Sequence, residues 1–249
     1  VDLPVFGPLK VGVFSTGNEL VQGGQPLAAG QIHDSNRPTL LALARSRGFE
    51  AIDLGWLPDD PAILTKALAS SIDQVDVLLT TGGAAGGDAD LLWHVLSQPM
   101  HHQGMALPTE AHAWKLKLRP GRPLVIGRIG QTPVFGLPGN PVAALLSFLF
   151  VIDAALQKMA GNTDPRPLPR IRARAGAAIR KRPGRQELLR VTLCYHESDD
   201  LPVAMPAGSQ SSAQLRSVAE ADGIAVLPED LGPVAEGDRL DVVPLHGLL

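Results

Sequence analysis

A glycine-rich stretch that ends in two acids is the part of this sequence best suited to chemistry. Residues 79–90 read LTTGGAAGGDAD, after the apolar run 75–79 and before a helical pattern at 91–96. This order predicts a strand, a glycine turn and a helix, so that backbone N–H groups and the positive end of a helix dipole face one anion. Asp88 and Asp90 suit a metal ion beside a phosphate. A tight turn with an acidic N-cap explains the same residues.

Other charged side chains are predicted at the same rim, the acids on loops and the bases on one strand and its turn. Carboxylates with water hold Mg²⁺, and Lys or Arg neutralises phosphate or oxyanion charge. The acids are Glu19, Asp34, Asp59, Asp60, Asp88 and Asp90, and the bases are Lys115, Lys117, Arg119 and Arg122. Asp34 and Asp60 also fit helix caps, and Lys117 also fits a solvated strand face.

The elements that position these residues alternate between strand and helix over residues 10–163. Strands are predicted at 10–16, 50–54, 76–81, 114–118 and 124–127, and helices begin near 34–36, 61, 91 and 142. The alternation predicts an α/β domain with a doubly wound, mostly parallel sheet, whose ligands bind beyond the carboxyl ends of the strands. Residues 1–9 are predicted to be a linker and residues 98–112 an irregular loop.

The periodicity changes after a proline-rich boundary at 161–169. Short strand-like runs at 171–179, 187–195, 202–205, 223–227 and 239–243 predict a small antiparallel β-barrel domain over residues 167–249. A basic group that includes Arg180 fits a solvated strand face or the barrel's contribution to an anion-binding cleft.

Composition narrows the class of protein. The 249 residues carry a net charge of −3, which argues against a nucleic-acid partner. The single cysteine, Cys194, excludes an intrachain disulfide and fits a reducing compartment. No apolar run is expected to reach the ~18 residues of a membrane span, and no signal peptide opens the chain. The sequence therefore predicts a cytoplasmic protein without a membrane partner.

Six motifs together resemble a known family. They are STGNEL at 15–20, QIHDSNR at 31–37, PDD at 58–60, the glycine stretch at 81–90, RPGRP at 119–123 and GLPGNP at 136–141. They occur in the order seen in MoeA-type molybdopterin molybdotransferases, whose animal counterpart is the E domain of gephyrin. The resemblance extends over essentially the whole chain.

The resemblance implies a MogA/MoaB-like molybdopterin-binding domain followed by the barrel. It implies an enzyme that inserts molybdate into adenylylated molybdopterin and releases AMP with the help of Mg²⁺. It also implies a homodimer whose site lies between the sheet domain of one subunit and the barrel of the other. By motif, Glu19, Asp59 and Asp90 would hold the metal, and Asp59, Asp90, Lys115 and Arg119 would be catalytic. The implied substrate-binding residues are Thr16, Gly17, Gly82, Gly83, Gly86, Gly87, Arg122, Pro138, Gly139, Asn140, Arg190 and Ser212.

The sequence also departs from the family pattern. Asn18 and Ala85 stand where the family usually has Asp and Ser, and Arg119 and Arg122 replace lysines. Family members carry two further domains ahead of the sheet domain, so the chain is either a fragment or a short form. Two other functions stay open: a molybdopterin adenylyltransferase, and a non-catalytic molybdopterin-binding or dimerising scaffold module.

Overall fold

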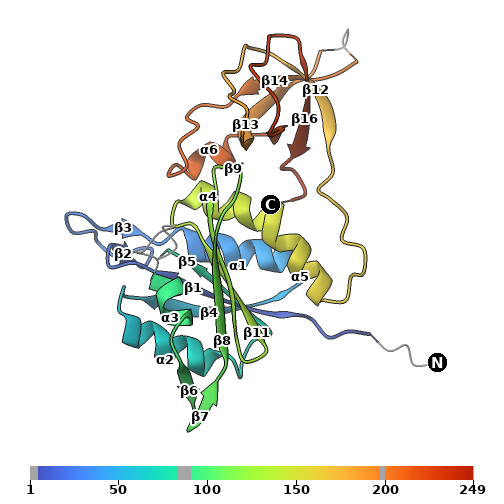
Figure 1. Ribbon diagram of the computed structural model, residues 1–249. Coiled ribbons are helices and arrows are strands. Elements are labelled where there is room, and N and C mark those ends of the chain that lie inside the picture. The colour runs from blue at the N-terminus through green and yellow to red at the C-terminus, as the bar shows by residue number, and fades with distance from the viewer. Residues whose placement is uncertain (1–4, 83–90, 197–199, 249) are drawn as a thin grey trace.

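A six-stranded sheet forms the centre of the first domain in the computed structural model, which describes residues 5–82, 91–196 and 200–248 (Figure 1). The order is β4-β1-β5-β11-β10-β8. The strands are β1 (Lys10–Thr16), β4 (Glu50–Leu57), β5 (Val77–Thr81), β8 (Thr109–Lys115), β10 (Pro123–Ile129) and β11 (Thr132–Leu137). Strands β4, β1, β5 and β11 pair in parallel, and β10 is antiparallel to its neighbours β11 and β8. The predicted mostly parallel sheet is confirmed.

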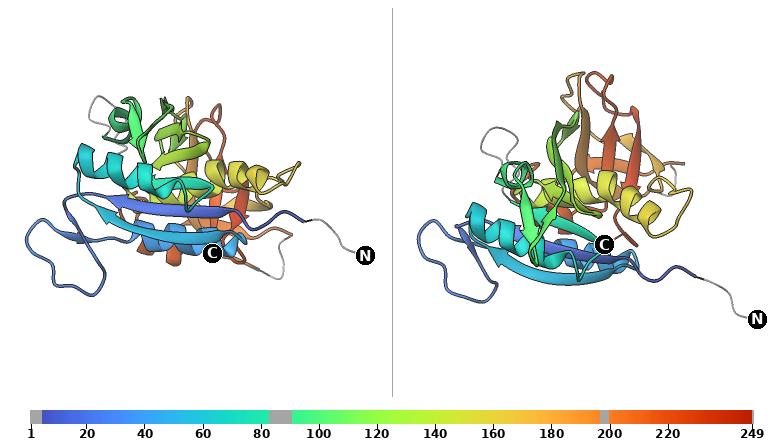
Figure 2. Two further views of the ribbon diagram at one scale, coloured as in Figure 1. Left: turned by 90° about the horizontal axis from the view of Figure 1, so that it is seen from below. Right: turned by 60° about the horizontal axis from the view of Figure 1, so that its bottom comes forward.

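Helices cover both faces of this sheet. The α1 helix (Asn36–Ser46) shares one apolar cluster with the long helix after β11, whereas α2 (Pro61–Ser71) and α3 (Leu91–Leu96) share the opposite cluster. Figure 2 shows α1 and α2 on opposite sides of β1 and β4. The Asp60 carboxylate accepts the N–H groups of Ala62 and Ile63 at 2.8 and 2.9 Å, which confirms the predicted cap at the start of α2.

The long helix consists of α4 (Pro141–Ser147), the π-helical turn η1 (Phe148–Ile152) and α5 (Asp153–Met159). It is 19 residues long and its most apolar 18-residue window has a mean hydropathy of 1.7, so by length and composition it could cross a membrane, contrary to the expectation that no apolar run is long enough. In this fold 61% of its most apolar window is buried. Its apolar side chains pack in the same cluster as β1 and α1, which explains the composition as that of a core helix.

The predicted loop at 98–112 is wrong. Residues 100–107 form a hairpin of β6 (Met100–His102) and β7 (Met105–Leu107), and β8 begins at Thr109. The turn places Gln103 and Gly104 at φ values of 49° and 78°, the pattern of a type I′ turn. Such turns usually carry Asn-Gly or Asp-Gly. Here Gly104 fits that pattern but Gln103 does not, so the sequence indicated a hairpin only weakly.

The second domain is a closed five-stranded barrel. Its strands are β12 (Ile171–Ala175), β13 (Gln186–Cys194), β14 (Val203–Pro206), β15 (Gly223–Leu227) and β16 (Arg239–Pro244). The order β14-β12-β16-β15-β13 closes through a β13–β14 pairing, which confirms the predicted barrel. The short helix α6 (Arg216–Ala219) was not predicted. Outside both sheets, β2 (Leu20–Val21) and β3 (Ile32–His33) form a two-stranded pair.

A short strand of the first domain joins the two domains. The strand predicted at 114–118 ends at Lys115, and β9 (Leu118–Arg119) pairs in parallel with the start of β13. Figure 1 shows β9 beside the barrel, away from the first sheet. The Val142 N–H donates to the Ser212 carbonyl at 2.9 Å, which links α4 to a barrel loop. The two domains are therefore hydrogen-bonded across a common seam.

A buried ion pair connects α1 to the long helix. The Arg47 Nε atom lies 3.4 Å from Asp153 Oδ2, and the two side chains are 15% and 5% exposed. Burial raises the pKa of Asp153, although Arg47 and a hydrogen bond from Gln157 act in the opposite direction.

We expect Asp153 to contribute a stability term that falls as the pH rises. Its folded pKa lies above the ordinary value of 3.8, so above that pH the folded state binds more protons than the unfolded state. Urea unfolding at a series of pH values should show wild type losing stability relative to Asp153→Asn through the folded pKa and then levelling off. A constant or rising difference would contradict this assignment.

Replacing Gly82 should destabilise the protein more than replacing another left-handed glycine. Gly82 has φ +88°, and a Cβ atom there would lie 2.1 Å from the Thr16 carbonyl oxygen. The matched control is Gly48, whose φ is +82° with no atom within 4 Å. We expect Gly48→Ala to cost about 1–2 kcal/mol. Gly82→Ala should cost roughly 1–3 kcal/mol more because of the clash. Equal losses in denaturant unfolding would show that the close approach carries no cost.

Candidate functional site

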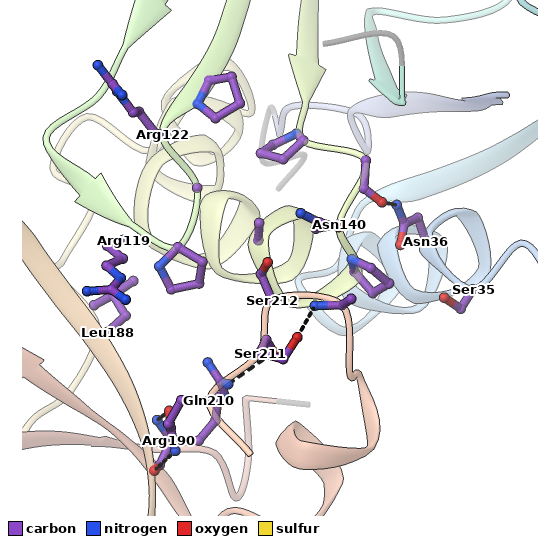
Figure 3. A pocket seen from close by; sticks show the side chains of 18 of the residues that line it. Ser35, Asn36, Arg119, Arg122, Asn140, Leu188, Arg190, Gln210, Ser211 and Ser212 are labelled. Atoms are coloured by element: carbon purple, nitrogen blue, oxygen red, sulfur yellow. Dashed lines mark hydrogen bonds between the residues drawn. The ribbon is translucent and has the colours of Figure 1, made fainter. Parts of the chain in front are cut away.

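A cavity of about 1230 Å³ lies between the carboxyl edge of the sheet and the barrel (Figure 3). Its walls come from the turns after β1 and β11, from the start of α1, from the turn after β9, and from the β13 strand with the barrel loop at 210–213. The predicted site residues that line it are Glu19, Arg119, Arg122, Pro138, Gly139, Asn140, Arg190 and Ser212. Segments far apart in the sequence thus meet at one cavity.

Other predicted site residues lie elsewhere. Gly83, Gly86, Gly87, Asp88, Ala85 and Asp90 are outside the described residues. Lys115 is exposed at the end of β8 and does not line the cavity. Thr16, Gly17, Gly82 and Asp59 are not part of the cavity lining.

The turn at Gly17 brings two carboxylates close to the end of β1. A Cβ atom at Gly17 would lie 2.8 Å from Glu19 Oε2, so the Glu19 carboxylate packs against this turn. The Asp59 carboxylate accepts the Asn18 N–H at 3.3 Å, and the Asn18 side chain accepts the Asp59 N–H at 3.1 Å. Asn18 therefore connects the turn to the residues before α2 through two hydrogen bonds with Asp59. Among the described residues no group of three or more His, Cys, Asp or Glu side chains could hold a metal.

Asn36 ties three walls of the cavity together. Its Nδ2 atom donates to Thr81 Oγ1 and to the Gly139 carbonyl, both at 2.7 Å, and Thr81 Oγ1 donates to the Pro138 carbonyl at 3.1 Å. The ends of β5 and β11 are thereby fixed to the start of α1. Sequence reasoning placed Asn36 near the start of a helix and within the QIHDSNR motif, but gave it no role in the site.

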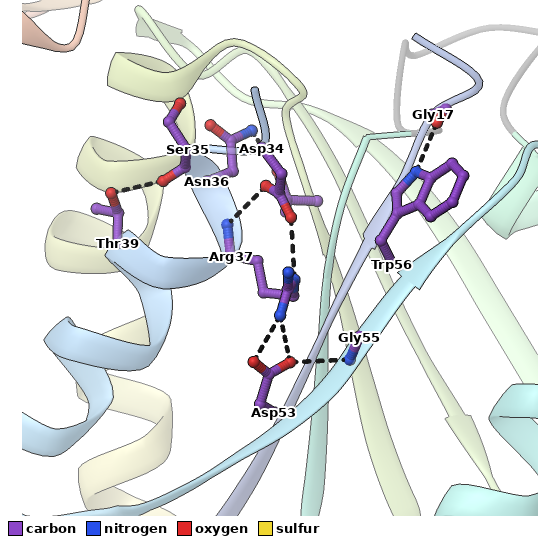
Figure 4. A network of polar contacts seen from close by, with 10 residues as sticks. Gly17, Asp34, Ser35, Asn36, Arg37, Thr39, Asp53, Gly55 and Trp56 are labelled. Carbon is purple, nitrogen blue, oxygen red and sulfur yellow. Dashed lines mark hydrogen bonds and ion pairs between the residues drawn. The ribbon is translucent and has the colours of Figure 1, made fainter. Parts of the chain in front are cut away.

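The neighbouring acid Asp34 is an ion-pair partner (Figure 4). It accepts the Arg37 backbone N–H at 3.2 Å and the Arg37 Nε–H at 2.9 Å, and the same guanidinium donates to both oxygens of Asp53. Burial alone would lower the pKa of Arg37, but the hydrogen bonds to Asp53 and Asp34 raise it. Asp34 is therefore neutralised by Arg37 at the edge of the cavity.

Arg190 is a buried cation on the barrel side of the cavity. It is 1% exposed, and its Nη2 atom donates to the Ser209 and Ser211 carbonyls at 3.0 and 3.1 Å. Within the described ranges its Nε atom has no hydrogen-bond partner and no carboxylate pairs with it. Burial lowers its pKa. Gln210, which the sequence did not single out, bonds to the backbone N–H and carbonyl of Arg190.

Arginines dominate the charge of the cavity. Arg119, Arg122, Arg180 and Arg190 line it, against the acids Glu19, Asp34 and Glu187. Glu187 lies 3.6 Å from the Arg119 guanidinium, and Asp34 is paired with Arg37. Arg122 and Arg180 form no ion pair within the described part of the chain. The cavity thus has a positive balance that suits an anion.

Comparison with known proteins agrees with this geometry. Residues 12–158 match the family model described as "probable molybdopterin binding domain", and residues 172–245 match "MoeA C-terminal region (domain IV)". The molybdopterin molybdenumtransferase of Haemophilus influenzae is 33% identical over 248 residues, which cover 100% of this chain and 59% of the relative.

Two further matches have the same character. The molybdopterin molybdenumtransferase of Nostoc is 32% identical over 246 residues, which cover 97% of this chain and 54% of the relative. A crystal structure of the MoeA protein of Pyrococcus horikoshii superposes with a TM-score of 0.75 and 30% identity, covering 95% of this chain and 54% of that one. The chain spans between half and three fifths of the length of these relatives. Because one family model covers more than half of the residues and a second covers the barrel, the chain belongs to the molybdopterin-binding family in its MoeA form.

Proposed function

We propose that this chain carries the substrate cavity of a transferase that inserts molybdate into adenylylated molybdopterin and releases AMP. The observation that carries the proposal is the guanidinium of Arg190, which is buried at the cavity without a carboxylate partner in the described residues. An unpaired buried charge is costly unless a ligand of opposite sign completes it. Molybdate and the phosphates of the nucleotide are ligands of that sign.

The arginines of the cavity would bind the negatively charged groups of the substrates, molybdate and the phosphates of the nucleotide. Arg190 belongs to the barrel strand β13, Arg119 to β9 and Arg122 to the turn after β9. A planar guanidinium presents two parallel N–H groups to an oxyanion, which suits both molybdate and phosphate. Asn36 would act as a positioning residue, because it fixes the turn at Gly139 that forms the opposite wall.

Glu19 and Asp59 are the described residues that would hold Mg²⁺. Both carboxylates flank the turn at Gly17, and oxygen donors of this kind are those that Mg²⁺ prefers. Bound there, the ion would supply positive charge to a phosphate of the nucleotide. Asn18 would keep the turn and Asp59 in register through its two hydrogen bonds.

The barrel favours this function over an adenylyltransferase, because its residues match the C-terminal region of MoeA. The homodimer and the catalytic roles of Lys115 and Asp90 stay predictions from the family resemblance, and the cytoplasmic location stays a prediction from composition.

The proposed function predicts molybdate-dependent release of AMP. The purified chain is incubated with adenylylated molybdopterin, molybdate and Mg²⁺, and AMP is followed by chromatography, with omission of molybdate as the control. AMP formation from ATP and free molybdopterin would instead support an adenylyltransferase. Binding of the nucleotide without any AMP release would support a non-catalytic module, and either result overturns the proposal.

Removing the Arg190 charge should weaken binding of molybdate. We expect Arg190→Met to lower the affinity about 10- to 100-fold, the loss of a charge-assisted hydrogen bond. The matched control is Lys181→Met, which removes another buried barrel cation. Lys181 is 2% exposed, donates to three backbone carbonyls and does not line the cavity. Calorimetric titration should show a normal affinity for molybdate in the control. Equal losses of affinity in both variants would contradict the role of Arg190.

A further inference from the structure

A second cavity of about 460 Å³ opens beside the first and shares Asp34 with it. Its volume falls within the range of about 300–1,000 Å³ that small-molecule sites occupy. The side chains of Arg37, Asp53, Gln22 and Trp56 line it. None of these four residues lines the first cavity, although Arg37 pairs with Asp34 at the boundary between the two.

A β-bulge turns Trp56 toward this cavity. Val13 pairs with Asp53 but Ser15 pairs with Trp56, so β4 carries one residue more than β1 between these points. Gly55 takes up the extra residue at φ +87°. Leu54 and Leu57 consequently both pack in the cluster with α2, and Trp56 falls on the same face as Asp53, the face covered by α1.

The indole of Trp56 is both exposed and fixed. It is 44% exposed, yet its Nε1–H donates to the Gly17 carbonyl at 2.6 Å, and Figure 4 shows the ring directed at that turn. A fixed aromatic ring with an open face is a stacking platform that loses little conformational entropy on binding. A flat heterocycle is the ligand that such a platform suits.

The polar groups specify which heterocycle fits. The Asp53 side chain is 47% exposed and accepts hydrogen bonds, the guanidinium of Arg37 donates them, and the Gln22 amide does both. Arg37 with Asp34 and Asp53 leaves one negative charge in excess, which repels phosphate and favours a neutral ring with N–H groups. A 2-amino-4-oxo edge, with two N–H donors beside a carbonyl acceptor, matches this set better than the edge of adenine does.

We propose that the Trp56 cavity binds the pterin ring of the substrate, stacked on Trp56 with its 2-amino-4-oxo edge toward Asp53. The assignment rests on the proposed function, which places the phosphates in the adjoining arginine-rich cavity. The two cavities then receive the neutral and the anionic parts of one ligand on the two sides of Asp34.

Neopterin is the probe, because it carries the pterin ring without phosphate or dithiolene. The chain has three tryptophans, so ¹H–¹⁵N spectra give three indole signals, assigned with Trp56→Phe, Trp93→Phe and Trp114→Phe. We expect neopterin to shift the Trp56 signal saturably and to leave that of Trp114 in place. No shift up to the solubility limit of neopterin overturns the proposal. An equal shift with adenosine, or tighter binding of guanosine than of neopterin, overturns it as well.

Variants then locate the contact through the fluorescence anisotropy of neopterin itself. Asp53→Asn should lower the affinity about tenfold, the effect of a hydrogen bond to a charged group. Gln22→Ala should lower it to a smaller extent, and it keeps the test valid if loss of the Arg37 pair unfolds the first variant. Trp114→Phe, remote from both cavities, is the control with unchanged affinity. Unchanged binding in Asp53→Asn and Gln22→Ala would exclude this edge.

The result is independent of the AMP assay, since neither molybdate nor Mg²⁺ is present. AMP release without a neopterin response at Trp56 would contradict the proposed pterin site and leave the proposed transferase function standing. A neopterin response without AMP release would contradict the transferase function and leave the pterin site standing.

Discussion

The pairing of β9 with β13 is the interaction on which the candidate site depends. Residues 116–123 leave the first sheet, reach the barrel edge and return to begin β10. Hydrogen bonds from the Leu116 N–H to the Arg122 carbonyl, and from the Gln186 N–H to the Lys117 carbonyl, hold the crossing segment at both sides. Gly121 fits closely against Ser147 of α4, where a Cβ atom would lie 2.6 Å from the hydroxyl. Without this crossing, Arg119 and Arg122 would not line the same cavity as Arg190.

Around this seam, short polar contacts fix the turns of the sheet edge. Asn36 binds the turn at Gly139, Trp56 binds the turn at Gly17, and Asn18 binds Asp59. Each contact joins elements that are distant in the sequence. At this edge lie two cavities of opposite electrostatic character, one rich in arginine and one with an excess of carboxylate.

Sequence patterns correctly predicted the helices and strands that are determined by residues adjacent in the sequence. The apolar run at 10–16 is β1 with the predicted bounds, and Asp60 with Pro61 starts α2 as the cap pattern indicates. The features that were missed depend on distant partners. The two-residue strand β9 exists only because Gln186 and Glu187 lie beside it, and the role of Asn36 requires Thr81 and Gly139. The hairpin at 100–107 was missed because Gln103 is an unusual residue at a turn position with positive φ. The motif resemblance pointed to Glu19, Arg119, Arg122 and Arg190, and the cavity brings these four together.

The hydrogen bond from Val142 to Ser212 has a consequence for how anions are recognised. An α-helix ordinarily offers several unpaired donors in its first turn, which form a ready anion site. In α4, Pro141 has no N–H, the Val142 N–H is occupied by the barrel loop, and the Ala144 N–H bonds within the helix to Asn140. Pro141 and Val142 therefore offer no free N–H to the cavity that this helix borders. Anion recognition then depends more on guanidinium side chains, whose attraction weakens as ionic strength rises and whose number a single substitution can change.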